Sequence, residues 1–243
     1  MERNVFEDAV TFYDLEWDTE YFGIKSAKAT LLKPLTINQW NELKNRFIDY
    51  QFISVVNQNS EPINAQYIGK DTSAFLADVN IQFGKKVVER YEMPNNITIQ
   101  NALKRNDQVL AIADFRFSKF TEDPELAKRG GAQVYRQWLI NSFDRQDKFY
   151  ALSTDENGYI TGFLLYSLSG NTCLIELIVV SKTASKSGIG TGLFKAVECD
   201  IRLKGFNEVI VGTQMRNLGA INFYHKVGCK QIGCHQVYHL WNL

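Results

Sequence analysis

The clearest alternation of hydrophobic and polar positions lies in the second half of the chain. Two runs rich in apolar residues, 148–153 and 159–168, flank the turn-forming segment Asp155-Glu156-Asn157-Gly158, which predicts a β-hairpin. The next run, 172–180, is almost entirely apolar, as expected of a strand covered on both faces. The pattern then predicts a helix at 193–203, a strand at 207–213, a helix at 217–227 and a closing strand at 230–243. This order predicts a mixed sheet with one right-handed crossover.

The first half of the chain has a weaker pattern. It predicts a helix at 37–50 and strand-like runs at 52–56 and 74–83. The segment 91–96 is rich in turn-forming residues, so it is the candidate boundary between a domain at 1–92 and a domain at 93–243. In the second domain, Asp123-Pro124-Glu125 predicts a helix start. Gly130-Gly131 interrupts that helix, and 134–143 continues it.

Composition excludes some classes of function. The chain has 243 residues, of which 45% are hydrophobic and 22% charged. Its 27 basic and 27 acidic residues give a net charge of zero, which argues against a nucleic-acid binder with a broad basic surface. The four cysteines form no C-x-x-C pair, so we expect free thiols in a reducing compartment and no metal site. Without a signal peptide or an apolar run of about 20 residues, we expect a cytoplasmic protein that does not enter the membrane.

A glycine-rich turn joins the apolar run 172–180 to the following helix. Its sequence from Ser185 to Gly192 is SKSGIGTG. The first backbone N–H groups of a helix lack partners and lie at the positive end of its dipole, so they suit a phosphate. The segment has neither the G-K-[ST] ending of a P-loop nor the spacing of the dinucleotide fingerprint. A plain strand-to-helix loop is the alternative. The residues proposed to bind the phosphates are Lys186, Ser187, Gly188, Ile189, Gly190 and Thr191.

Two motifs resemble those of the GNAT superfamily of N-acetyltransferases. Gly188 and Gly190 fit the pattern [QR]-x-x-G-x-[GA], although Ser185 replaces its Gln or Arg. Asn217, Ala220, Tyr224 and Gly228 fit N-x-x-A-x-x-x-Y-x-x-x-G on the next helix, with Cys229 where Phe is commoner. The resemblance implies an α+β fold: a mixed, mostly antiparallel sheet flanked by helices. It also implies acetyl-CoA as cosubstrate and a small-molecule amine as acceptor. GNAT sheets often pair, so a homodimer is expected.

Other segments resemble the dTDP-fucosamine acetyltransferases, which acetylate the amine of a nucleotide-linked dideoxysugar. They are Leu15–Gly23, Arg116-Phe117 with Tyr135-x-x-Trp138, Thr213–Tyr224 and, more weakly, Tyr238-x-Leu240-Trp241. In that group a smaller partial GNAT-like domain precedes the GNAT domain, which agrees with a boundary near residue 92. The resemblance therefore implies a nucleotide-linked amino sugar as acceptor. Aromatic rings can stack on it and Arg can bind its diphosphate, so the acceptor candidates are Trp17, Asp18, Phe22, Arg116 and Trp138. Each of them could instead be an ordinary core or surface residue.

The resemblance also assigns roles in catalysis. Tyr224 matches the general acid that protonates the departing thiolate, although a core tyrosine would give the same helical apolar stripe. Glu176, inside the apolar run, and Asp78 are candidate bases for the proton of the amine. A water molecule is an equal alternative to both. Without a catalytic role, Glu176 would be a glutamate at the edge of the sheet and Asp78 an aspartate in a loop. The backbone of Ile178, Val179 and Val180 is expected to bind the pantetheine amides and the carbonyl oxygen. Asn217 is expected to bind the cofactor, cap its helix, or do both.

Two other functions remain open from the sequence. The chain could acetylate another amine, such as a peptide, a polyamine or an antibiotic, because the CoA motifs are more specific than the N-terminal half. It could also be a CoA-binding sensor without catalysis, because Ser185 replaces the usual long polar side chain.

Overall fold

The computed structural model describes residues 8–88, 92–115, 117–184 and 188–242. In these residues one sheet has the strand order β1-β2-β3-β10-β4-β9-β8-β7-β6-β5. The strands are β1 (Val10–Asp14), β2 (Ser26–Leu31), β3 (Phe52–Asn57), β4 (Phe75–Lys86), β5 (Ile97–Asn101), β6 (Lys148–Thr154), β7 (Ile160–Ser169), β8 (Thr172–Val180), β9 (Glu208–Gln214) and β10 (Lys230–Trp241). The helices are α1 (Glu16–Phe22), α2 (Ile37–Phe47), α3 (Pro62–Asp71), α4 (Asp107–Ile112), α5 (Lys119–Glu122), α6 (Pro124–Lys128), α7 (Val134–Ser142), α8 (Ile189–Leu203) and α9 (Leu218–Lys226).

Helices cover both faces of this sheet. Helices α8 and α9 pack on one face through a core that includes Phe83, Leu164 and Val211. Helices α2 and α3 pack on the same face at the other end of the sheet, over Ile53 and Leu240. The opposite face carries α4 and α7 at one end and α1 and α6 at the other. The alternation of side chains along each strand therefore divides the core into clusters on two faces.

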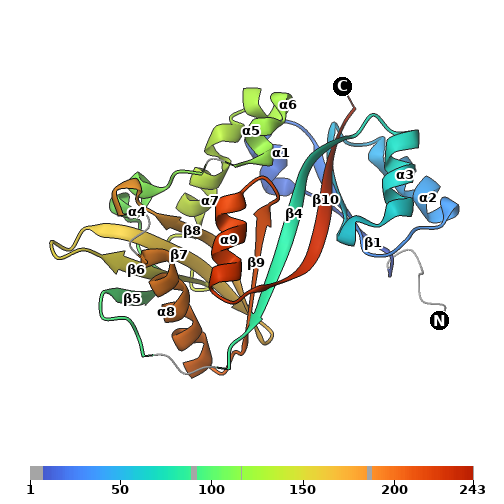
Figure 1. The fold of residues 1–243 in the computed structure, drawn as a ribbon. Coiled ribbons are helices and arrows are strands. Elements are labelled where there is room, and N and C mark those ends of the chain that lie inside the picture. The colour runs from blue at the N-terminus through green and yellow to red at the C-terminus, as the bar shows by residue number, and fades with distance from the viewer. Residues whose placement is uncertain (1–7, 89–91, 116, 185–187, 243) are drawn as a thin grey trace.

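The two halves of the chain repeat one connection and exchange their last strands. Parallel strands β2 and β3 are joined by α2, and parallel strands β8 and β9 are joined by α8. A further helix and an antiparallel strand follow each pair: α3 and β4 in the first half, α9 and β10 in the second. Strand β10 pairs with β3, and β4 pairs with β9, so each half completes its sheet with a strand from the other. Figure 1 shows β4 and β10 side by side in the middle of the molecule.

The strongly patterned elements of the second half are confirmed, with shifted ends. Helix α8 begins at Ile189, four residues before the predicted start, and α7 follows the left-handed Gly130 as expected. The expectation that the strand at 172–180 is covered on both faces is wrong at its beginning, because Leu174 is 45% exposed. The division of the chain at residue 92 stays a prediction. Within the described residues no helix is both long and apolar enough to cross a membrane.

Candidate active site

A wedge opens where β8 and β9 separate. Residues Thr172–Ile175 of β8 pair with Glu208–Val211 of β9, but β8 continues to Val180 paired only with β7. A cavity of about 280 Å³ fills the opening. Its lining includes Glu176, Leu177 and Ile178 on one side and Gly212, Thr213 and Gln214 on the other. The backbone of β8 beyond Ile175 therefore faces a cleft on its β9 side, where a ligand with amide groups can pair with it.

A β-bulge lies at the point where the strands part. Leu165 pairs with Leu177 and Tyr166 with Ile175, which leaves Glu176 as the extra residue. The Glu176 carboxylate lies 2.5 Å from the Nζ of Lys148, and both side chains are largely buried. The other carboxylate oxygen of Glu176 is buried without a hydrogen-bond partner among the described residues. The Glu176 carboxylate thus forms an ion pair with Lys148 through one of its two oxygens.

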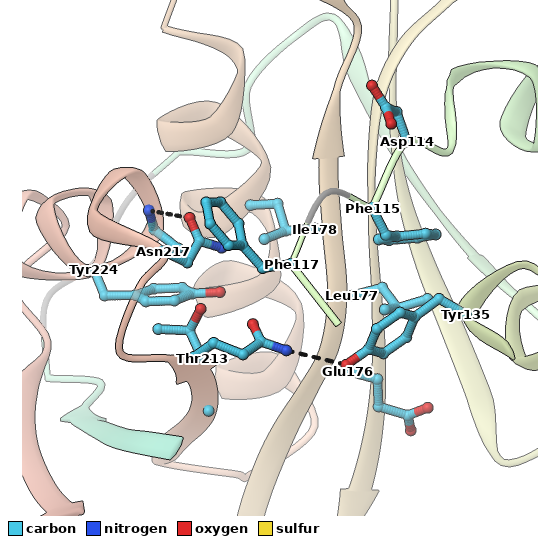
Figure 2. A pocket seen from close by; sticks show the side chains of 13 residues that line it. Asp114, Phe115, Phe117, Tyr135, Glu176, Leu177, Ile178, Thr213, Asn217 and Tyr224 are labelled. Carbon is cyan, nitrogen blue, oxygen red and sulfur yellow. Dashed lines mark hydrogen bonds between the residues drawn. The ribbon is translucent and has the colours of Figure 1, made fainter. Parts of the chain in front are cut away.

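Tyr224 lies on α9 at the opposite side of the wedge. Its side chain is 3% exposed, and its ring packs 5.5 Å from that of Phe83. The residue lines the cavity, and its hydroxyl points into it beside Thr213 (Figure 2). Burial raises the pKa of Tyr224 well above its usual range, with a smaller contribution from Cys229. The phenol therefore stays protonated at neutral pH and can donate a proton to an anion formed in the cavity.

Asn217 begins α9 at the rim of the same cavity. Its Oδ1 accepts a hydrogen bond from the backbone N–H of Ala220 at 3.2 Å, which caps the helix. It also lines the cavity. The capping role is observed, and binding of the cofactor by Asn217 stays a prediction.

The glycine-rich turn meets α8 at the end of β8. Gly188 is the N-cap of α8 and has φ 86°, a left-handed conformation that favours glycine; it provides no side-chain cap for the helix. A Cβ at Gly190 would lie 3.2 Å from the ring of Phe223 on α9, so this glycine permits the two helices to approach closely. The predicted phosphate ligands Lys186 and Ser187 lie outside the described residues. Ile189, Gly190 and Thr191 form the first turn of the helix, where an anion is favoured.

The side of the cavity next to α7 is formed by Tyr135 and Gln214, with Asp78 of β4 nearby. Tyr135 on α7 lines the cavity, and its hydroxyl accepts a hydrogen bond from the Nε2 of Gln214 at 3.1 Å. Burial raises the pKa of Tyr135. The hydrogen bond from Gln214 lowers this pKa, and the negative charge of Asp78 raises it further. Asp78 lies on β4 two residues before Asn80, which pairs with the cavity-lining Gln214. Burial also raises the pKa of Asp78, against the attraction of Lys119.

Lys119 connects two of the predicted acidic residues. Burial lowers the pKa of Lys119, as does the nearby Lys28, while Asp78 and Asp18 oppose the shift. The pKa of Asp18 is raised, because burial outweighs the attraction of Lys119. Asp18 of α1 and Asp78 of β4 thus both lie close enough to the Lys119 ammonium group to interact with it electrostatically.

A second cavity of about 310 Å³ lies next to this cluster. Trp17, Asp18 and Trp138, all predicted acceptor residues, line it together with Phe120, Val134 and Asn141. The ring of Trp138 stacks on that of Tyr135 with centroids 6.1 Å apart, and Tyr135 lines the first cavity. Phe22 is 5% exposed and lies in the core, outside the linings of both cavities. Arg116 lies outside the described residues.

Several residues of the site were not predicted from the sequence. Tyr135 and Gln214 stand in the segments that carry the resemblance, so their positions gave a signal that was not used. Lys119 and the cavity-lining Asp114 gave none; Asp114 forms an ion pair of 2.7 Å with Lys182, next to the glycine-rich turn. Among the described residues no group of three or more His, Cys, Asp or Glu side chains could hold a metal ion.

Comparison with known proteins identifies relatives of this chain. The sequence profile described as the acetyltransferase (GNAT) family matches residues 107–229. SpsD of Bacillus subtilis (strain 168), named a spore coat polysaccharide biosynthesis protein, is 23% identical over 132 residues, which are 54% of this chain and 45% of SpsD. The uncharacterised protein YdhI of the same organism is 32% identical over 117 residues, 48% of this chain and 65% of YdhI. The chain thus spans less than two thirds of the length of both curated relatives.

A solved structure shares the fold. The GCN5-related N-acetyltransferase from Sphaerobacter thermophilus superposes with a TM-score of 0.62 at 13% identity, covering 96% of this chain and 76% of that protein. This likeness concerns the fold alone, and it confirms the predicted mixed sheet flanked by helices.

Proposed function

The chain belongs to the acetyltransferase (GNAT) family, and on this basis we propose that it transfers the acetyl group of acetyl-CoA to an amine on a nucleotide-linked sugar. The observation that carries the transfer reaction is the wedge between β8 and β9. It brings to one cleft a buried, protonated phenol and the edge of β8 that β9 leaves unpaired, and the first turn of α8 lies against the end of that strand at Val180.

The wedge fits the parts of acetyl-CoA. The pyrophosphate suits the N-terminal turn of α8, and the pantetheine amides suit the β8 backbone at Ile178, Val179 and Val180. A backbone N–H near the bulge can hydrogen-bond the thioester oxygen and stabilise the negative charge that develops there. The thioester then lies in the cavity into which the hydroxyl of Tyr224 points (Figure 2).

The reaction requires two proton transfers. The neutral amine nitrogen attacks the thioester carbonyl carbon, a C–N bond forms, and the C–S bond breaks. Tyr224 donates its hydroxyl proton to the departing thiolate, which would otherwise be a poor leaving group. The proton lost by the amine passes to a base, and solvent restores the phenol proton.

Asp78 fits the base better than Glu176 does. One oxygen of the Glu176 carboxylate forms an ion pair with the Nζ of Lys148 at 2.5 Å. Asp78 is half-buried near Tyr135, and the raised pKa of its carboxyl makes it a stronger base than an exposed aspartate. A bound water can complete the path from the amine if the carboxylate does not reach it directly.

Two observations support a nucleotide-linked sugar as the acceptor. SpsD is named as a polysaccharide biosynthesis protein. The second cavity is lined by Trp17, Phe120 and Trp138, whose rings can stack on a planar base, while Asp18 can accept hydrogen bonds from it. The stacked rings of Tyr135 and Trp138 link this cavity to the reacting centre, as an extended acceptor requires.

The test measures free thiol released from acetyl-CoA with a dTDP-4-amino-4,6-dideoxyhexose. We expect Tyr224→Phe to lower kcat by about 100-fold or more, the range for a general acid, without changing the affinity for CoA. The control is Tyr159→Phe, because Tyr159 is 63% exposed on the hairpin and lines neither cavity. It should behave as wild type.

The outcomes separate the proposed function from its alternatives. Thiol release with a polyamine, a peptide or an antibiotic, but with no sugar nucleotide, means another acceptor class. CoA binding without turnover on any amine, and without an effect of Tyr224→Phe, means a CoA sensor. Absence of CoA binding by calorimetry removes the proposal altogether.

A further inference from the structure

A row of polar side chains crosses the sheet beside the first cavity. Along β4, Asp78, Asn80 and Gln82 point to one face, because alternate residues of a strand share a side. Ile81 and Phe83 point to the other face and pack in the core beneath α8 and α9. Asp78, Asn80 and Gln82 therefore face the acceptor side of the sheet.

The neighbouring strand extends this row to the cavity. Gln214 of β9 pairs with Asn80, and Gly212 pairs with Gln82. Gln214 and Gly212 both line the cavity that contains the Tyr224 hydroxyl. We call Asn80, Gln82 and Gln214 the carboxamide row. All three side chains are half-buried. Gln214 and the neighbouring Gly212 border the cavity where acetyl transfer is proposed.

Gly212 packs directly against the side chains of Asn80 and Gln82. A Cβ at position 212 would lie 2.6 Å from the Nε2 of Gln82 and 2.8 Å from the Oδ1 of Asn80. These two side chains hydrogen-bond to each other and lie directly against the glycine. Any larger residue at 212 would force both carboxamides to move. The arrangement of Asn80 and Gln82 thus depends on the absence of a side chain at a residue that lines the cavity.

We propose that the carboxamide row binds the ring hydroxyls of the acceptor and thereby selects a carbohydrate amine. This assignment rests on the proposed function and adds the residues that recognise the sugar. A carboxamide presents two N–H donors and an accepting oxygen, so it can match hydroxyl groups that both donate and accept. An amine without hydroxyls would leave unmatched the donors and acceptors of the row that the Asn80–Gln82 and Gln214–Tyr135 hydrogen bonds do not use, which costs binding energy.

The surroundings of the row favour this ligand over a peptide or an anion. Strand β4 is paired on both sides, by β10 and β9, so a peptide cannot add to it as a further strand. At one end of the row Lys119, Glu122 and Arg216 act on the Asp78 carboxyl, and at the other end β4 finishes with Lys85 and Lys86. The row itself consists of neutral carboxamides. Neutral hydroxyls fit it, and the charged part of an extended acceptor fits the end near Lys119.

The experiment measures sugar binding without acetyl transfer. Saturation-transfer NMR is recorded on the full chain with methyl glycosides of gluco, galacto, manno and fuco configuration, which carry no amine. We expect at least one glycoside to bind the wild type. Asn80→Ala and Gln82→Ala should each weaken that binding about fivefold, the effect of one lost hydrogen bond, and Gly212→Ala should also weaken it. Gln231→Ala is the control, because exposed Gln231 pairs with Phe83 and faces the other side of the sheet.

Two results would overturn the assignment. The first is that no glycoside of the panel binds the wild type. The second is that a glycoside binds the Asn80→Ala and Gln82→Ala variants as tightly as it binds the wild type. Failure of the proposed function is separate: glycosides bind through the row, but no amine is acetylated. The converse result is acetylation of an amine without hydroxyls together with no binding of any glycoside. It would support acetyl transfer but exclude the carboxamide row as a sugar-binding site.

Discussion

Replacing Asp123 by Ala should destabilise the protein far more than the loss of a helix cap. Asp123 has no exposed surface. Its Oδ1 accepts from the backbone N–H groups of Glu125 and Leu126 and caps α6. Its Oδ2 lies 2.6 Å from Nδ1 of the buried His239 and accepts from Nε1 of Trp241 at 3.0 Å. This one carboxylate therefore joins α6 to the end of β10.

The magnitude follows from these contacts. Losing the cap costs about 1 kcal/mol. The His239 and Trp241 donors lose their partner inside the protein, at about 1–3 kcal/mol each. The total, about 3–7 kcal/mol, is a large part of the roughly 5–15 kcal/mol that stabilises a typical domain. Asn106→Ala is the matched control, because Asn106 caps α4 through the N–H groups of Gln108 and Val109, and its side chain accepts no bond from a His or Trp.

Urea unfolding at neutral pH measures both variants. We expect Asn106→Ala to cost about 1 kcal/mol and Asp123→Ala several times more. Asp123→Asn, which keeps a capping oxygen, should lie between them and provides a measurement if the alanine variant does not fold. Equal losses for Asn106→Ala and Asp123→Ala would refute the reasoning, because the His239 and Trp241 contacts would then contribute nothing.

The pH dependence provides a second check on the same contacts. Burial acts to raise the pKa of Asp123, but the hydrogen bonds from His239 and Trp241 outweigh it and hold the pKa below its usual value. A lowered carboxyl pKa contributes stability above the unfolded value of about 3.9, and this is lost as the pH falls through the folded value. Burial lowers the pKa of His239, so the folded protein favours the neutral imidazole. The stability that this neutral imidazole contributes is lost as the pH falls below about 6.5. His239 titrates in the wild type and in the variant, so the part of the cost of Asp123→Ala that comes from the Asp123 charge should shrink only as the pH falls below about 3.9.

Two further predictions concern the half-buried carboxyls of Asp78 and Asp18. If Asp78 is the base, the fall of kcat/KM at low pH should disappear in Asp78→Asn together with most of the activity, whereas Glu176→Gln should keep the pH profile; an unchanged profile in Asp78→Asn would exclude this role. Burial raises the pKa of Asp18, so its charge opposes folding at neutral pH; Asp18→Asn should raise the melting temperature at pH 7, and the gain should vanish below the unfolded pKa of about 3.9, where both carboxyls are neutral. A lower melting temperature at pH 7 would contradict the second prediction.

The sequence predicted the elements whose pattern is local. Helix α2 begins at the predicted Ile37 because Thr36 and Gln39 form a capping box. Helix α6 begins after Asp123 for a similar reason. Strands β1, β2 and β5 and helices α1, α3, α4 and α5 were missed. All of them except α3 have seven residues or fewer, and helix α1 and strand β1 mix polar and apolar residues without a clear period. Their positions depend on packing against distant parts of the sheet, which no local pattern records.

The candidate site divides in the same way. Tyr224, Asn217 and the glycine-rich turn follow from motifs within one or two adjoining elements, and the described members lie around the wedge. The acceptor side needs α1, β4, α7 and β9 together. That assembly depends on β4 lying between β10 and β9, whereas the sequence gives β4 only as a strand of the first half. The sequence could therefore not predict the pairing of Asn80 with Gln214 or the electrostatic interactions of Lys119 with Asp18 and Asp78.

The repeated connection shows why only one half carries a site of this kind in the described structure. In the second half, β8 and β9 pair over four residues and then separate. In the first half, β2 and β3 pair over their whole length, from Ser26 with Phe52 to Leu31 with Asn57. A wedge cannot open between fully paired strands, so the first half offers no equivalent cleft for a pantetheine chain.

The side chains of the first half reinforce this difference. Tyr224 is the seventh residue of α9, and the seventh residue of α3 is Ile68, which is fully buried and has no proton to donate. Asn64 of α3 donates to the carbonyl of Lys33 and to Asn57, and accepts from the N–H of Leu35. These bonds tie α3 to the loop after β2, on the side where the second half has its opening. The first half therefore lacks an equivalent of the wedge and of Tyr224, and it contributes β4, which carries Asp78 and two members of the carboxamide row to the neighbourhood of the wedge.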